Sequence, residues 1–190
     1  GDVVGFRRQT DATTIILADG LGSGIKANIT AQMCVSRFLG LIDHGATLRE
    51  AFSAIVTTMN SAWGRHEAFS VFSVARILSN GYTTVLSYDS PPPLIISHGI
   101  AKVLEDRVYT LEKAIICENI SRLEEGESLL LMSDGITQAG MGKGAVNGWE
   151  SKGVASFINK TLKNEQFKGE NLLKLVHDQS KVLAGNKHAD

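Results

Sequence analysis

Residues 15–24 read IILADGLGSG and residues 129–135 read LLLMSDG, so two hydrophobic runs each lead into Asp-Gly. A single Asp-Gly pair usually marks only a turn. Two pairs at the exits of hydrophobic strands instead favour carboxylates that are each held in a fixed direction. The glycine after each aspartate is expected to let the backbone turn sharply.

Aspartates that converge from neighbouring strand ends form a pocket lined by oxygen ligands only. Mg²⁺ and Mn²⁺ prefer such ligands, in octahedral geometry and with several waters retained. Two ions about 3.5–4 Å apart activate a shared water and clamp the oxygens of a phosphoryl group. The pairs that begin at Asp19 and Asp134 therefore predict a dimetal site.

The composition is that of an ordinary globular domain. The chain has 190 residues, 43% of them hydrophobic and 21% charged, with a formal net charge of −1. These values predict one buried core and argue against a nucleic-acid-binding surface, and no apolar run is long enough to span a membrane. Cys34 and Cys117 lie in apolar stretches. They favour structural thiols in a reducing, cytosolic setting, although a disulfide stays open. The five histidines show no zinc-binding spacing.

The hydrophobic periodicity indicates an α+β fold. Short β-branched runs and alternating stretches predict strands, and apolar residues at helical spacing predict helices, on which Met33 and Met59 are expected to fill the core. Thr47 is the expected N-cap of the second helix. The predicted order is a strand, two helices, a block of antiparallel strands and two further helices. The expected strands are 12–18, 68–77, 82–89, 91–97 and 127–133, and the expected helices are 24–42, 48–62, 150–162 and 170–184.

Neither glycine-rich stretch matches a nucleotide-binding loop. Gly20, Gly22 and Gly24 form GxGxG rather than the dinucleotide fingerprint GxGxxG. The later GMGKG has Gly144 where a P-loop needs Ser or Thr. The glycines therefore do not predict a nucleotide site.

Several motifs, taken in order, resemble the metal-dependent protein phosphatases, which are the PPM or protein phosphatase 2C family. The resemblance is strongest to the bacterial branch that contains stage II sporulation protein E and the sigma-B regulator phosphatases, and it covers almost the whole chain. The matching segments are GD at 1–2, ADGLGSGIKA at 18–27, FSVFSVARI at 69–77, PPPLII at 91–96, LEEGESLLLMSDGITQA at 123–139 and AD at 189–190.

This resemblance implies two antiparallel β-sheets sandwiched between helix layers, an α-β-β-α architecture, with two bound Mn²⁺ or Mg²⁺ ions. Asp19 would bridge both ions, Gly20 would offer its backbone carbonyl to one, and Asp134 would bind the second. Asp2 would contact the ions or their waters, and Asp190 would complete the second ion's site. Asp19 and Asp134 are thus the expected catalytic residues of an enzyme that hydrolyses phosphoserine or phosphothreonine without a covalent intermediate.

The resemblance also implies a bacterial, cytoplasmic signalling enzyme. Its partner would be a phosphoprotein substrate, with an anti-sigma antagonist as the candidate. No nucleic acid and no direct membrane contact are expected, and a dimer is left open. We expect residues 1–190 to form a single catalytic domain that comes from a longer protein and that lacks the family's last strand.

The chain departs from the family pattern at three places, and its phosphate-binding arginine is unassigned. Leu21 stands where eukaryotic members carry a His that protonates the leaving group, so no general acid is assigned. Gln138 stands where the branch often has Glu, and YDSPPP at 88–93 replaces a common Asn-Ala-Gly-His before the prolines. Arg7 and Arg8 are the candidates for phosphate binding, although a solvated pair is the favoured interpretation.

Two alternatives to an active phosphatase stay open. One is a catalytically weak regulatory module that keeps the fold and binds a partner, although the presence of both Asp19 and Asp134 argues against it. The other is a nucleotide-binding protein, which would lack a recognisable phosphate loop.

Overall fold

The computed structural model describes residues 1–22, 24–65, 67–143, 146–163 and 169–185. Contacts divide the chain into two compact units. Unit 1 comprises residues 1–90 and 106–123, and unit 2 comprises 91–105 and 124–190. The strands are β1 (Asp2–Arg8), β2 (Ala12–Gly20), β3 (Ser70–Leu78), β4 (Tyr82–Tyr88), β5 (Leu94–Ser97), β6 (Ile100–Val103), β7 (Arg107–Leu111), β8 (Ala114–Arg122) and β9 (Ser128–Leu130). The helices are α1 (Ile25–Asp43), α2 (Leu48–Gly64), α3 (Asp134–Thr137), α4 (Glu150–Leu162) and α5 (Gly169–Leu183).

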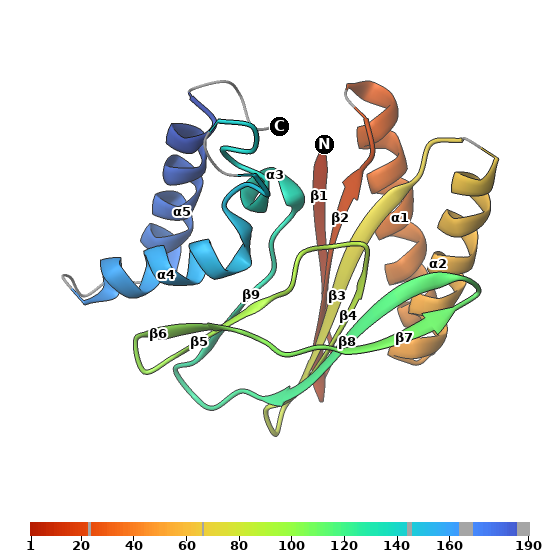
Figure 1. The fold of residues 1–190 in the computed structure, drawn as a ribbon. Coiled ribbons are helices and arrows are strands. Elements are labelled where there is room, and N and C mark those ends of the chain that lie inside the picture. Colours follow the sequence, from red (N-terminus) through yellow and green to blue (C-terminus); the bar gives the residue numbers. More distant parts are fainter. Residues whose placement is uncertain (23, 66, 144–145, 164–168, 186–190) are drawn as a thin grey trace. The chain divides into compact units, whose positions relative to one another are not determined.

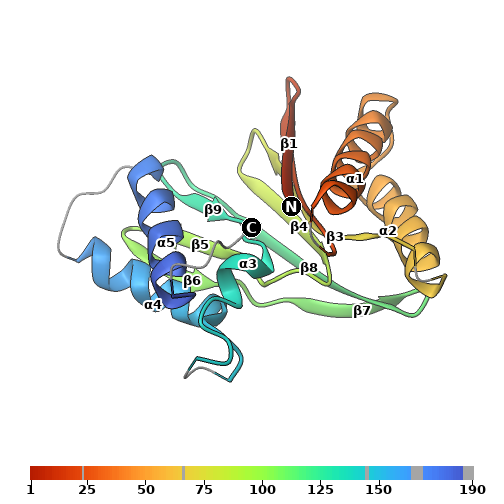
Figure 2. The same cartoon turned by 90° about the horizontal axis from the view of Figure 1, so that it is seen from above.

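Unit 1 is built on an antiparallel sheet with the strand order β1-β2-β3-β4-β8-β7. Every second residue of β2, from Ala12 to Gly20, is buried, while the residues between them are half-buried. This alternation is typical of a strand with one face under a helix layer. Helices α1 and α2 form that layer and lie side by side (Figures 1 and 2).

Three aromatic rings join the helix layer to the middle of this sheet. The ring centroids of Phe52 on α2 and Phe72 on β3 are 5.1 Å apart, and Phe72 lies 5.8 Å from Tyr88 on β4. Tilted contacts of this kind add about 0.5–1.5 kcal/mol to the gain from burying the rings. They hold α2 over the central strands.

Helix α2 begins with the predicted cap. The Thr47 hydroxyl accepts a hydrogen bond from the Glu50 amide at 3.3 Å, and the Thr47 amide donates one to the Glu50 carboxylate at 2.8 Å. This reciprocal pair is a capping box, which satisfies backbone donors at the start of a helix. The N-cap prediction is therefore confirmed.

Helix α1 turns a different face to the sheet from the one expected. Met33 is 66% exposed, and Ile25 and Ile29 on the same stripe are 79% and 51% exposed, so the prediction that Met33 fills the core is wrong. Small side chains on the opposite face let the helix approach the strands closely. That buried face consists of Ala27, Ala31, Cys34, Val35, Phe38 and Ile42.

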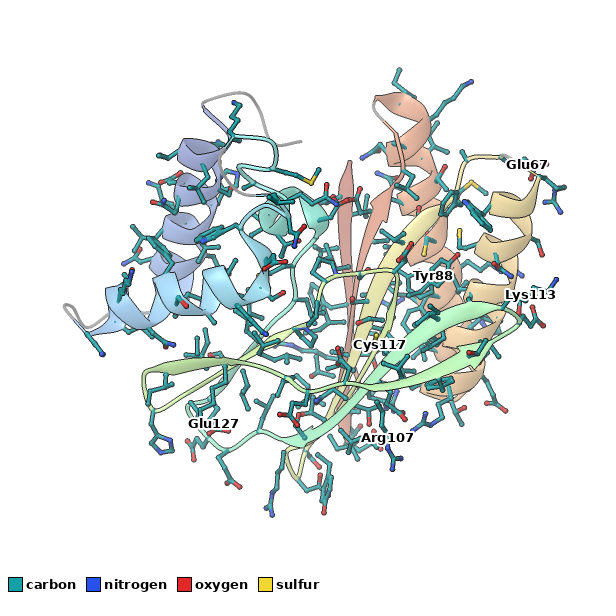
Figure 3. All side chains as sticks on the ribbon, in the orientation of Figure 1. Glu67, Tyr88, Arg107, Lys113, Cys117 and Glu127 are labelled. Atoms are coloured by element: carbon teal, nitrogen blue, oxygen red, sulfur yellow. The ribbon has the colours of Figure 1, made fainter. Side chains whose placement is uncertain are left out.

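Tight turns connect the antiparallel strands. The predicted hairpin at residues 79–81 joins β3 to β4, with Gly81 at a φ of 84°. Between β7 and β8, Glu112 and Lys113 have φ values of 46° and 72° (Lys113 is labelled in Figure 3). Two consecutive residues at positive φ form a turn whose twist matches that of the flanking strands.

Unit 2 contains the antiparallel sheet β6-β5-β9, which packs against helix α4. The Asn159 amide on α4 bridges to β6, because it accepts from the Ala101 backbone N–H at 2.6 Å and donates to the Ala101 carbonyl at 3.0 Å. An edge ring contact of 5.5 Å between Trp149 and Phe157 flanks the core of this unit. The core residues are Leu94, Ala101, Met132, Val154, Ala155, Ile158, Leu172 and Val176.

The α+β class with antiparallel sheets and helix layers is confirmed, but the strands differ from those expected. The predicted strand 127–133 is wrong in extent, because β9 covers only Ser128–Leu130 and its two leucines are half-buried. Among the described strands, β9 pairs only with β5, so it lacks the second neighbour that would bury it. Four strands, β1, β6, β7 and β8, have no counterpart in the prediction. Two of them, β6 and β7, have only four and five residues, and charged or polar residues interrupt the apolar residues of β1 and β8.

Both cysteines are free thiols. Burial raises the pKa of Cys34 to about 12, so this thiol stays neutral. For Cys117 on β8 (Figure 3), burial is the main cause of a raised pKa, followed by the charges of Asp106 and Asp89. Neither thiol has the lowered pKa of a reactive cysteine. Among the described helices, none is long and apolar enough to cross a membrane.

Candidate metal centre

Asp2 and Asp19 lie directly opposite each other at one end of the β1–β2 pair. Residues directly opposite in an antiparallel pair have their side chains on the same face, with Cβ atoms about 4.5–5.5 Å apart. The Asp19 side chain is 19% exposed, and one of its carboxylate oxygens lies 3.8 Å from the backbone nitrogen of Gly1. The pairing therefore places two carboxylates side by side.

Gly20 determines which way Asp19 points. A Cβ atom at Gly20 would lie 1.9 Å from the Ala27 carbonyl oxygen in the first turn of α1, so this position faces the helix layer. Because successive residues of a strand point to opposite faces, the Asp19 side chain points away from α1. The close approach of α1 thus leaves room for glycine alone after Asp19.

The expected sharp turn does not occur at Gly20 itself. Gly20 belongs to β2 and pairs with Ser70, and the Leu21 amide still donates to the Phe69 carbonyl at 3.0 Å. The chain turns afterwards, where Gly22 and Gly24 have φ values of 99° and 81°. These positive values favour glycine, and they lead the chain directly into α1.

Asp134 has a different setting in unit 2. It is the first residue of the short helix α3, whose N-cap is Ser133. The Gln138 backbone N–H donates to the Asp134 carbonyl at 2.7 Å, and the Gln138 side-chain amide donates to Asp134 Oδ2 at 3.0 Å. A hydrogen bond from a side chain, rather than a strand partner, therefore holds this carboxylate.

The structure brings some of the predicted ligands together. Asp2, Asp19 and Gly20 share one end of the sheet in unit 1, whereas Asp134 belongs to unit 2. Asp190 lies outside the described residues. Within the described part of the chain, no group of three or more His, Cys, Asp or Glu side chains is placed to hold a metal ion. The assignment of all five residues as ligands stays a prediction.

The two arginines near the N-terminus do not accompany Asp2. Arg7 is five residues further along β1, or about 17 Å at the usual rise per residue. Its guanidinium donates to the Asp43 carboxylate at 2.6 Å, and both side chains are exposed. Arg8 follows at the same end of the strand and is also exposed. This placement favours the interpretation of a solvated pair.

The donors present fit a hard divalent cation. Asp2 and Asp19 offer oxygens only, and two like charges directly opposite on a sheet destabilise it. A divalent cation between them would offset this repulsion, and Mg²⁺ and Mn²⁺ prefer carboxylate oxygens. In unit 2, Asp134 also offers carboxylate oxygens, one of which accepts from the Gln138 amide.

Sequence reasoning named Gln138 only as a departure from the family pattern and did not name Gly148, although both residues organise the Asp134 segment. Gln138 lies four positions after Asp134, a spacing at which Gln and Asp side chains form hydrogen bonds on a helix, so a signal was present. Gly148 has a φ of 82°, and a Cβ there would lie 2.6 Å from the Gln138 Cα and 2.7 Å from the Thr137 carbonyl oxygen. That contact has no local signal, because the two segments meet only in the folded chain.

Known structures share the fold of this chain. The PP2C phosphatase domain and regulatory-domain fragment of the cell fate determinant SpoIIE from Bacillus subtilis matches with a TM-score of 0.75, at 15% identity over 100% of this chain and 55% of that one. The RsbU and RsbW domains of Rv1364c from Mycobacterium tuberculosis give 0.73, at 17% identity over 96% and 51%. RsbX in complex with magnesium gives 0.57, at 16% identity over 86% and 78%.

The chain therefore has the fold of PP2C phosphatase domains, and it spans about half the length of the first two of these structures. No curated protein sequence matches it. The family model of stage II sporulation protein E matches residues 9–190, which is nearly the whole chain. The chain belongs to the stage II sporulation protein E (SpoIIE) family.

Proposed function

We propose that this chain is a metal-dependent phosphatase domain that removes phosphate from phosphoserine or phosphothreonine of a regulatory protein. The observation that carries the proposal is the direct pairing of Asp2 with Asp19 beside Gly20, in a chain of the SpoIIE family. In this proposal, residues 1–190 act as one catalytic domain.

The proposed ligands of two Mn²⁺ or Mg²⁺ ions are Asp2, Asp19, the Gly20 carbonyl, Asp134 and Asp190. When bound, such ions supply Lewis acidity and charge neutralisation for the attack of water on a phosphoryl group. Asp19 is held by its strand partners and Asp134 by the Gln138 amide, so neither carboxylate has to be oriented during the reaction. The magnesium complex of RsbX, a protein of the same fold, supports the choice of metal.

No side chain is assigned as the general acid in this proposal. Leu21 directly follows the Asp19-Gly20 pair and has no proton to donate. The leaving alkoxide would then take its proton from water. A pH–rate profile with a histidine-like limb that vanishes on one His substitution would contradict this assignment.

The proposed substrate is a phosphoprotein of a bacterial signalling system, with an anti-sigma antagonist as the candidate. The support is that this chain matches about half of a structure of the RsbU and RsbW domains of one protein, and also a structure described in connection with the bacterial stressosome. Peptides that carry phosphoserine, phosphothreonine or phosphotyrosine, offered at equal concentration, test the class. We expect release of phosphate from the first two only.

The decisive test is the hydrolysis of p-nitrophenyl phosphate by the protein that carries these residues, with Mn²⁺ and with EDTA. We expect Mn²⁺-dependent turnover that falls by more than about 100-fold in Asp19→Ala and in Asp134→Ala. This loss exceeds the one usually seen when a residue that only hydrogen-bonds to a metal ligand is replaced. Asp43→Ala in unit 1 and Asp178→Ala in unit 2 are the matched controls, because both carboxylates are exposed and lie outside the proposed ligand set.

Two results would contradict the proposal. Equal activity in Asp19→Ala and in Asp43→Ala would remove Asp19 from the catalytic residues. A folded protein that binds Mn²⁺ but shows no turnover on any of these substrates would favour the regulatory module instead.

A further inference from the structure

The side chain of Gln138 makes a specific contact with one carboxylate oxygen of Asp134. Its amide nitrogen donates to Asp134 Oδ2 at 3.0 Å. Gln138 is exposed and Asp134 is half-buried. A hydrogen bond to a charged acceptor is stronger than a neutral one, so this contact restricts the rotation of the carboxylate although water reaches it.

The backbone that carries both residues is itself fixed. The Gln138 N–H donates to the Asp134 carbonyl at 2.7 Å, which closes one helical turn, and the Gln138 carbonyl accepts from the Met141 N–H at 2.9 Å. Gly148 lies directly against the Thr137–Gln138 backbone, where a Cβ would come within 2.6 Å of Gln138 Cα. The loop that follows α3 thus returns to hold the turn from outside.

We propose that Gln138 is a positioning residue for Asp134, and this inference rests on the proposed function. Its amide donates to Oδ2, and the carboxylate held in this way would offer Oδ1 as a ligand to a divalent cation. A glutamine suits this role because its N–H group donates to a carboxylate, whereas a glutamate at neutral pH only accepts. As a neutral residue, Gln138 orients the ligand without adding charge to the site.

The test compares Mn²⁺ affinity, measured by isothermal titration calorimetry, among variants that keep the backbone unchanged. Gln138→Met has a similar length but no donor, and Gln138→Asn keeps the amide but is one methylene too short. We expect both to bind Mn²⁺ about 10-fold more weakly than the unmodified protein. Replacing a residue that hydrogen-bonds to a metal ligand typically weakens metal binding by at least this factor. Gln9→Met is the matched control, because Gln9 is exposed and follows β1 at the end opposite Asp2.

A second readout separates positioning from a merely structural role. We expect the melting temperature in EDTA to be the same in Gln138→Met as in Gln9→Met, because the contact is exposed. The side-chain amide signal of Gln138 in a ¹⁵N NMR spectrum should move when Mg²⁺ binds. A fall in the metal-free melting temperature with unchanged Mn²⁺ affinity would overturn the inference.

Asp134→Ala makes the two possible failures distinguishable. If Asp134→Ala binds Mn²⁺ more weakly but Gln138→Met and Gln138→Asn bind it like the control, Asp134 is a ligand and the inference about Gln138 is wrong. If Asp134→Ala itself binds Mn²⁺ like the control, then the proposed metal site is wrong as well.

Discussion

The two Asp-Gly pairs share a dipeptide but hold their carboxylates by different means. Asp19 lies inside a strand, where hydrogen bonds to β1 and β3 and the alternation of the sheet set its direction. Asp134 opens a four-residue helix, where one side-chain amide and the packing of Gly148 set it. The first arrangement depends on a large sheet and the second on a few contacts.

The Asp-Gly dipeptide alone therefore does not reveal why a glycine near the site is needed. Gly20 is required because the backbone of α1 approaches it closely, whereas its own φ is not positive. Gly148, ten residues beyond Gln138, is required both by its φ of 82° and by the backbone it touches. Four substitutions test this contrast, and the most damaging is described first.

Gly20→Ala should be the most damaging change. Its Cβ would lie 1.9 Å from the Ala27 carbonyl oxygen, so α1 or β2 must move. We expect a loss of more than about 4 kcal/mol in the free energy of unfolding, measured in urea, as for other severe backbone clashes. Gly22→Ala is the control. Gly22 has open space around it and a φ of 99°, so this variant should lose only about 1–2 kcal/mol in the free energy of unfolding. Equal losses would show that α1 does not pack tightly on β2.

Gly148→Ala should be next, with its effect centred on α3. The new Cβ would clash with the Thr137–Gln138 backbone, and its φ of 82° is strained for alanine. We expect a loss of about 2–4 kcal/mol, with faster hydrogen exchange at the Gln138 amide. Gly142→Ala, in the same loop and also at positive φ but with open space around it, isolates the clash. Unchanged exchange at Gln138 would argue that Gly148 does not hold α3.

Thr47→Ala should have a moderate effect on the helix layer behind the Asp19 strand. Loss of this cap should lower the melting temperature by about 2–4 °C, whereas Thr57→Ala inside the same helix should not. Hydrogen bonds from the Thr47 backbone and side chain lower the pKa of Glu50. The capping box therefore stabilises the fold fully above the ordinary pKa of Glu and loses this effect as the pH falls through the lowered value. The difference in melting temperature between the unmodified protein and Thr47→Ala should therefore become smaller in acid. A difference that stays the same would contradict this account.

Arg7→Ala should have the smallest effect. Its ion pair with Asp43 is exposed on both sides, and such pairs contribute about 0–1 kcal/mol. Phosphatase activity should stay unchanged, as it should in Arg8→Ala, because both residues are at the end of β1 opposite Asp2. A large rise in KM in either variant would restore the idea that these arginines bind phosphate.

Much of the fold could be predicted because its signals are local. The helices that became α1, α2, α4 and α5 follow from periodic apolar residues, and the turn at residues 79–81 follows from its Asn-Gly pair. The face of α1 could not be predicted, because Ile25, Ile29 and Met33 form as regular a stripe as the buried alanines do. The strands within residues 100–122 were also missed, because they depend on pairing with neighbouring strands and their own sequences show only weak alternation.

Sequence alone was enough to locate the four long helices, the hairpin turn at residues 79–81 and the two aspartates that follow hydrophobic runs. These features depend on residues within a few positions of one another. The folded structure was needed to show that Asp2 faces Asp19, that α1 permits only glycine at position 20, and that Gly148 holds the turn carrying Asp134 and Gln138. Strand register and close backbone packing bring together residues that are not neighbours in the sequence, so a local sequence pattern cannot predict these contacts.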